Sequence, residues 1–200
     1  MRSKVNKPAS NAFRVELGSG FILLFALIWF FDESGFIAAL IPAVLVHELG
    51  HICFLLFFGG RPTKMKATLS GLRIDYSGYL TEVQEMLAAL AGPAFGLVFS
   101  FLCAGFGRLW GSEYLLMCAG IGFVVNLFNF LPVLPLDGGR VLGFTLRIIL
   151  GYDRARPVLH AVGAVTSALI LALGLYCIAR GLGPALFFAG VWLLVLRYKH

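Results

Sequence analysis

The feature that most constrains this chain is an apolar run long enough to cross a lipid bilayer, with ionisable residues near its middle. Residues 36–58 read FIAALIPAVLVHELGHICFLLFF. At about 1.5 Å per residue, a helix of this length crosses the hydrocarbon core. An ionisable side chain at mid-bilayer costs at least about 2.5 kcal/mol, so such residues usually mark function. This run carries three of them, His47, Glu48 and His51.

The spacing of these three residues indicates a metal site. His47 and His51 are four positions apart, so in a helix both imidazoles leave the same face. In the HExxH arrangement two histidines bind zinc and the glutamate between them acts as a general base. A chance motif with structural histidines is the competing interpretation. However, the chain has only four histidines, two of them are here, and a glutamate between them in lipid needs a reason.

The composition assigns the chain to the membrane proteins. Of its 200 residues 60% are hydrophobic and 13% are charged, and the mean hydropathy is +0.90. A soluble domain of this size cannot bury so much apolar surface. The net charge of +6 could suggest nucleic acid, but the basic residues flank apolar runs, which suits lipid headgroups better. We therefore expect the lipid bilayer as a partner, and no nucleic acid.

We expect an all-α polytopic membrane protein with about six transmembrane helices and a short β-hairpin after the second. The expected spans are residues 18–31, 36–58, 82–107, 114–131, 158–179 and 184–196. The first span is expected to remain uncleaved, and the run 141–150 is too short to cross, so it should be interfacial or re-entrant. The domain division is an N-terminal tail (1–17), a membrane core (18–196) and a C-terminal tail (197–200). The four cysteines lie singly in apolar runs, which predicts neither disulfides nor zinc ligation.

The hairpin is predicted over residues 64–76, where the apolar period changes from helical to two. Apolar and polar residues alternate on both sides of a turn at Ser70-Gly71. An ordinary connecting loop is the competing interpretation. We expect this segment to associate with the membrane.

The distribution of Lys and Arg predicts the orientation of the chain. With six spans, fourteen of the sixteen basic residues lie on the side of the N-terminal tail, and only Arg108 and Arg180 lie on the other. The positive-inside rule then places both termini, the hairpin and the loop before Arg140 in the cytoplasm. We expect a multi-pass protein of the cell membrane whose active-site opening is also cytoplasmic.

A catalytic zinc takes three protein ligands, so one more is needed besides the two histidines. Asp137 is the best candidate, because it lies in PVLPLDGGR, where two prolines and two glycines break the fourth span. An aspartate in an ordinary turn is the competing interpretation. The other candidates are His160 and His200, near span ends, and Asp153, in a polar loop.

Three motifs together resemble the site-2 protease family of intramembrane zinc metalloproteases. They are HELGH at 47–51, AGP at 91–93 and NFLPVLPLDGGR at 129–140. The resemblance covers roughly residues 18–196 and is greatest to compact bacterial members related to the sporulation factor-processing protease. It implies that His47, His51 and Asp137 bind Zn²⁺ and that Glu48 is the catalytic acid/base. It also implies that Asn129 contacts substrate.

The implied function is hydrolysis of peptide bonds within or near transmembrane segments of membrane-anchored protein substrates, with a regulatory membrane protein as a further partner. The chain departs from the family at Gly96, where many members carry asparagine. The alternative from another class is a transporter or ion pathway that uses the His/Glu/Asp cluster. Internal repeats would favour the transporter, and the sequence has none. A catalytically inactive relative would have a damaged HExxH or LDG motif, and both motifs are intact.

Overall fold

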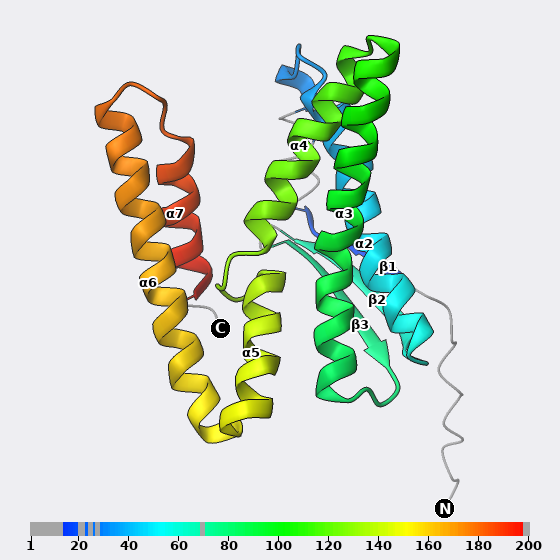
Figure 1. Ribbon diagram of the computed structural model, residues 1–200, viewed down its shortest axis with the longest axis vertical. Helices are drawn as coiled ribbons and strands as arrows, with labels where there is room; N and C mark the ends of the chain where they lie inside the picture. Colours follow the sequence, from blue (N-terminus) through cyan, green and yellow to red (C-terminus); the bar gives the residue numbers. More distant parts are fainter. Residues whose placement is uncertain (1–13, 20–22, 24–25, 27–28, 69–70, 198–200) are drawn as a thin grey trace, which may run out of the picture.

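The computed structural model of the chain is mostly helical, with a small sheet beside the helices (Figure 1). It describes residues 14–19, 23, 26, 29–68 and 71–197. In chain order the elements are β1 (Arg14–Leu17), α2 (Phe36–Phe57), β2 (Arg61–Thr68), β3 (Gly71–Ser77), α3 (Glu82–Trp110), α4 (Glu113–Asn129), α5 (Asp137–Leu150), α6 (Tyr152–Ala179) and α7 (Ala185–Arg197). Helices α2, α3 and α4 pack together, α6 pairs with α7, and α5 contacts both α3 and α6 (Figure 1).

Among the described residues, three helices are long and apolar enough to cross a membrane, namely α2, α3 and α6. Helices α4 and α7 are apolar but shorter. Many large apolar side chains point outward from these helices, as expected where lipid replaces water. The coarse prediction of a helical membrane protein is thereby confirmed. Half of the expected first span, 18–31, lies outside the described residues.

Two helices begin earlier than the sequence predicted. Helix α5 begins at Asp137, and α6 begins at Tyr152, so the polar residues 152–157 are helical rather than a loop. Gly151 separates the two helices with a φ of 77°, a conformation that favours glycine. Asp153 then lies in the first turn of α6, where a negative charge suits the helix dipole.

Helix α2 has polar support at its start and at its proline. Before the helix, the Asp32 carboxylate accepts hydrogen bonds from the backbone N–H groups of Phe36 (3.1 Å) and Ile37 (2.7 Å). Within it, Pro42 has no N–H to donate to the carbonyl one turn earlier, that of Ala38. The Tyr114 hydroxyl of α4 donates to that carbonyl at 2.9 Å. A side chain from a neighbouring helix thus supplies the hydrogen bond that the proline removes.

The predicted hairpin is confirmed and is longer than expected. Strands β2 and β3 pair antiparallel over residues 61–77, while Leu69 and Ser70 lie outside the described residues. The sequence did not predict β1, which pairs parallel with β2 inside the segment taken as a tail. Four residues are too few to show an alternating pattern, and an ion pair between Glu16 and Lys64 joins the two strands. Ile74 and Tyr76 of β3 pack against a cluster of Leu55, Leu80 and Ala88.

Two glycines let helices α2 and α3 approach each other closely. A Cβ at Gly50 would lie 2.5 Å from the carbonyl oxygen of Ala91, and a Cβ at Gly92 would lie 2.2 Å from Nε2 of His51. Neither contact leaves room for a methyl group. This close approach brings the α2 histidines against α3.

We expect Gly50→Ala to destabilise the protein by about 1–3 kcal/mol, because the methyl group must push α2 away from α3. Chemical unfolding in detergent micelles measures the change. The matched control is Gly120→Ala in α4, since a Cβ there has no neighbour within 4 Å. Equal stability of the two variants would contradict the close-packing argument.

Candidate metal centre

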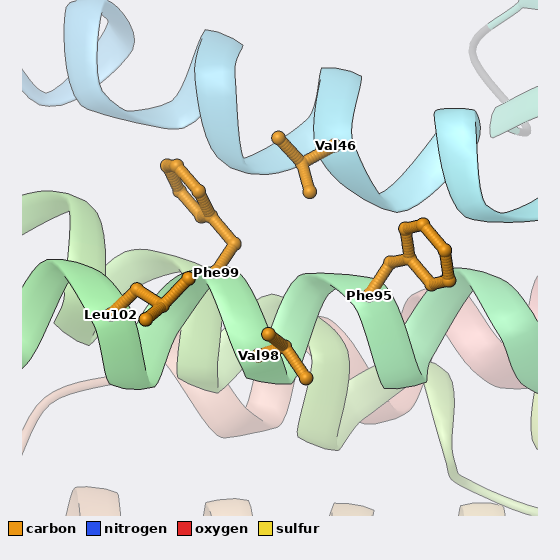
Figure 2. Close-up of a pocket in the computed structure, with 5 residues that line it drawn as sticks. All are labelled: Val46, Phe95, Val98, Phe99 and Leu102. Atoms are coloured by element: carbon orange, nitrogen blue, oxygen red, sulfur yellow. The ribbon is translucent and has the colours of Figure 1, made fainter.

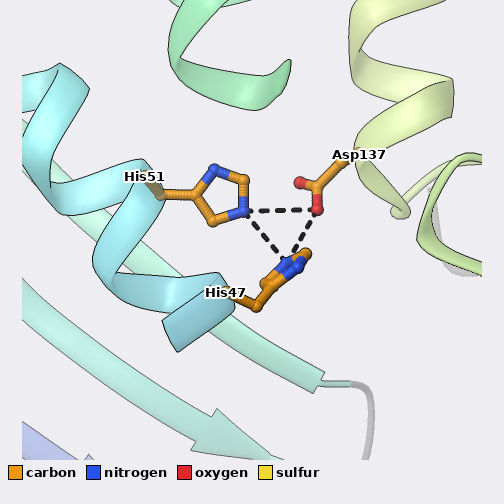
Figure 3. Close-up of side chains that lie close together, drawn as sticks. All are labelled: His47, His51 and Asp137. Atoms are coloured by element: carbon orange, nitrogen blue, oxygen red, sulfur yellow. Dashed lines mark hydrogen bonds and ion pairs between the residues drawn. The ribbon is translucent and has the colours of Figure 1, made fainter. Parts of the chain in front are cut away.

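Three ligand-type side chains from two helices meet at one point (Figure 3). Oδ2 of Asp137 lies 3.1 Å from Nε2 of His47 and 3.2 Å from Nε2 of His51. The two Nε2 atoms are 3.2 Å apart. All three residues are buried. The structure therefore brings together the two motif histidines and the best of the candidate third ligands.

The loop before α5 determines where Asp137 lies. Residues 130–136 fold back over the first turn of the helix. A Cβ at Gly138 would lie 2.1 Å from the carbonyl oxygen of Phe130, and one at Gly139 would lie 2.4 Å from the carbonyl carbon of Val133. Both glycines of the LDGG motif are thus needed for close approach, and they leave the Asp137 side chain facing α2 (Figure 3).

Helix α5, which carries Asp137, also contacts α3 through polar side chains. Arg147 and Glu82 form an ion pair, with Nε and Oε1 3.8 Å apart. The Thr145 hydroxyl lies 3.4 Å from Sδ of Met86. These contacts join the C-terminal half of α5 to the first turns of α3.

Each histidine has a partner on its other ring nitrogen. Nδ1 of His51 lies 2.8 Å from the backbone carbonyl oxygen of Ala88, and Nδ1 of His47 lies 2.8 Å from Oδ1 of Asn126. A carbonyl oxygen only accepts, so His51 donates from Nδ1 and its Nε2 carries a lone pair. Partners of this kind orient metal-binding histidines.

The donor set fits a zinc ion. Ligand atoms at about 2.0–2.1 Å from a tetrahedral zinc lie about 3.3 Å from one another. The three observed separations of 3.1–3.2 Å are close to that value. Lone pairs so close together repel one another unless a cation lies between them. Two imidazoles with one carboxylate also form a common catalytic zinc set.

Glu48 and Arg140 are the charged residues nearest to this cluster. The Glu48 carboxylate forms no hydrogen bond or ion pair with any described residue, although it interacts electrostatically with Asp137 and Arg140. Arg140 contacts Oδ1 of Asp137 through Nη1 at 3.4 Å. Oδ2 of Asp137 therefore faces the histidines, and its Oδ1 faces Arg140. The Glu48 carboxylate is not engaged by either group.

A second polar contact lies where the sheet meets α3. The Tyr76 hydroxyl of β3 donates a hydrogen bond to Glu85 in the first turn of α3. Burial and the negative charge of Glu85 raise the pKa of Tyr76 to about 12. The phenol therefore stays protonated at neutral pH and ties the sheet to the helix.

Other residues singled out from the sequence are not in the cluster. His160 and Asp153 lie on α6 and belong to no metal-type group among the described residues, and His200 lies outside them. Asn129 is the last residue of α4; it is half-buried and has no hydrogen bond to a side chain of the described residues. Asn126, the partner of His47, was not predicted as a site residue. Its only signal was a polar side chain inside an apolar helix.

The pocket between α2 and α3 is separate from this polar cluster. It has a volume of about 260 Å³ and is lined by apolar side chains of both helices (Figure 2). The lining residues are Val46, Phe95, Val98, Phe99 and Leu102. None of them can act as an acid, a base or a metal ligand.

Comparison with known proteins agrees with this assignment. Residues 108–173 match the model of peptidase family M50. Over 141 residues the chain is 24% identical to a zinc metalloprotease of Methanocaldococcus jannaschii. This alignment covers 68% of this chain and 41% of that protein. The chain thus spans less than half the length of this relative.

A solved structure shows the same fold. The site-2 protease from Methanocaldococcus jannaschii superposes with a TM-score of 0.69 at 20% sequence identity, covering 92% of this chain and 89% of that one. The matched family segment includes Asp137, and the shared fold brings the HExxH helix to it. The family match over residues 108–173, the similar zinc metalloprotease and the shared fold agree with the resemblance to site-2 proteases that the sequence motifs indicate.

Proposed function

We propose that this protein is an intramembrane zinc metalloprotease that cleaves peptide bonds within or near transmembrane segments of membrane-anchored proteins. One observation carries the proposal: the two histidine Nε2 atoms and the Asp137 carboxylate converge within 3.2 Å, with the unpaired Glu48 beside them. His47, His51 and Asp137 would hold the zinc. The match of residues 108–173 to peptidase family M50 and the similarity to a zinc metalloprotease support this proposal.

The chemistry divides between the metal and Glu48. Zinc, when bound, acidifies water and polarises the scissile carbonyl. Glu48 accepts the proton of the attacking water and transfers it to the leaving amine nitrogen. Its lack of a partner among the described residues suits this role, because a carboxylate already in an ion pair is a weaker base. Asn129 is proposed to contact the substrate, as the family resemblance implies.

The substrate must expose its backbone to reach this site. A transmembrane helix hides its carbonyl groups in its own hydrogen bonds, so the segment to be cut must unwind. The described sheet has the order β1-β2-β3, so β3 is an outer strand. We propose that an outer strand of this sheet pairs with the unwound substrate. A regulatory membrane protein is a further partner in this proposal.

We also propose six transmembrane spans, with both termini and the active-site opening in the cytoplasm. The charge distribution supports this orientation, since fourteen of sixteen basic residues fall on one side. Helix α3, at 29 residues, is about 43 Å long, enough to cross the whole bilayer. Residues 78–81 and Ser112 then lie at its opposite ends.

The purified protein is expected to contain about one zinc ion per chain. Asp137→Ala should lose most of that zinc because it removes one of three ligands. Elemental analysis of protein purified without added metal measures the content. The matched control is Asp153→Ala, which removes an exposed aspartate of α6 and should retain zinc. Full zinc retention by Asp137→Ala would exclude Asp137 as a ligand.

Glu48→Gln should lower the cleavage rate by at least about 10²-fold, because glutamine keeps the shape but cannot accept the proton. Zinc content and thermal stability should stay near those of the wild type, since Glu48 is not a ligand. The measurement is cleavage of a co-expressed membrane-anchored substrate, followed by gel mobility. Wild-type cleavage by Glu48→Gln would contradict the mechanism, and the transporter alternative predicts no cleavage by either form.

Cysteines introduced at Tyr79 and Ser112 are expected to be labelled from opposite sides of the membrane. Tyr79 is 90% exposed and precedes α3, whereas Ser112 follows it. A membrane-impermeant maleimide, applied to intact cells in a variant without the four native cysteines, should label only position 112. Labelling of both positions would show that the proposed topology is wrong.

A further inference from the structure

A fully buried asparagine stands behind the first histidine of the metal centre. Asn126 of α4 is 0% exposed. Its Oδ1 lies 2.8 Å from Nδ1 of His47, and its Nδ2 donates to the carbonyl oxygen of Gly122 at 2.6 Å. Both ends of the amide are therefore used, and the side chain has one orientation available.

The Gly122 carbonyl determines the hydrogen positions along this chain of contacts. A backbone carbonyl only accepts, so it must face the NH₂ end of the amide. Oδ1 then faces His47, and the imidazole must donate from Nδ1. As a result Nε2 of His47 keeps its lone pair and points at Asp137, 3.1 Å away. His51 reaches the same state through a direct contact with the Ala88 carbonyl.

Residue 96 on α3 must have no side chain if the Asn126 amide is to lie beside His47. A Cβ built on Gly96 would lie 2.1 Å from Oδ1 of Asn126 and 2.2 Å from its Nδ2. Even a methyl group would displace the amide from His47. By contrast, a Cβ at Gly105, nine residues further along the same helix, has no neighbour within 4 Å.

We propose that Asn126 is a positioning residue of the metal centre, and that Gly96 provides the space in which its amide lies. The two residues act as one unit: α3 contributes the gap and α4 the side chain that fills it. The Cβ of an asparagine at position 96 would occupy the place where the Asn126 amide now lies. If residue 126 were small, an asparagine on α3 could therefore supply the amide oxygen that accepts the hydrogen bond from His47. The inference rests on the proposed zinc centre.

The first test separates the acceptor from the volume of the side chain. Asn126→Leu fills similar space but cannot accept the Nδ1 proton, and Gly96→Ala keeps Asn126 but displaces its amide. Loss of such a partner lowers metal affinity by about 10- to 100-fold. Each purified variant is titrated with a zinc chelator, and cobalt substitution reports the ligand geometry by its visible spectrum. Gly105→Ala is the matched control and should bind zinc as the wild type does.

The second test moves the amide to the other helix. Asn126→Ala and Gly96→Asn alone should each lose zinc affinity, the first for lack of an acceptor and the second by a clash. The double variant Gly96→Asn/Asn126→Ala should recover most of the affinity and the wild-type cobalt spectrum. Thermal unfolding of the metal-free proteins measures the structural cost separately, and a purely structural asparagine would change this stability without changing the chelator titration.

The outcomes distinguish this inference from the proposed function. Wild-type zinc affinity in both Asn126→Leu and Gly96→Ala would overturn the positioning role while leaving the metal centre intact. If Asn126→Leu does not fold, Gly96→Ala decides the question. Absence of zinc from the wild-type protein would overturn the metal centre itself and the inference with it.

Discussion

The structure depends on one constraint: polar atoms buried among apolar helices need partners inside the protein. His47, His51 and Asp137 lie in a bundle whose outer surface is mostly apolar. Each histidine has a hydrogen-bond partner for its Nδ1 atom. That partner is the amide oxygen of Asn126 for His47 and the backbone carbonyl oxygen of Ala88 for His51. Among the described residues, no buried side-chain nitrogen or oxygen lacks a hydrogen-bond partner.

Glycine makes these contacts possible, because it lets backbones and buried side chains come within reach. Gly50 and Gly92 allow α2 to touch α3, so that His51 meets the Ala88 carbonyl. Gly138 lets the loop before α5 fold back, so that Asp137 faces the histidines. In a membrane, where no hydrophobic force draws helices together, such close contacts also supply much of the packing energy.

Polar side-chain contacts connect the sheet and α5 to the first turn of α3. Tyr76 joins β3 to the first turn of α3 through Glu85, and Glu82 in the same turn pairs with Arg147 of α5. The start of α3 therefore contacts both the sheet and the helix that carries Asp137.

The sequence by itself determined the membrane class, the helical content, the hairpin and the types of ligand, because these follow from composition and short spacings. HELGH places two imidazoles on one helix face wherever that helix lies. The tertiary structure decided which distant groups meet them. It brought Asp137, and not His160 or Asp153, to the two histidines, added β1 to the hairpin, and placed Asn126 behind His47. These choices depend on how closely α2, α3 and α4 approach one another, and local spacing does not encode that distance.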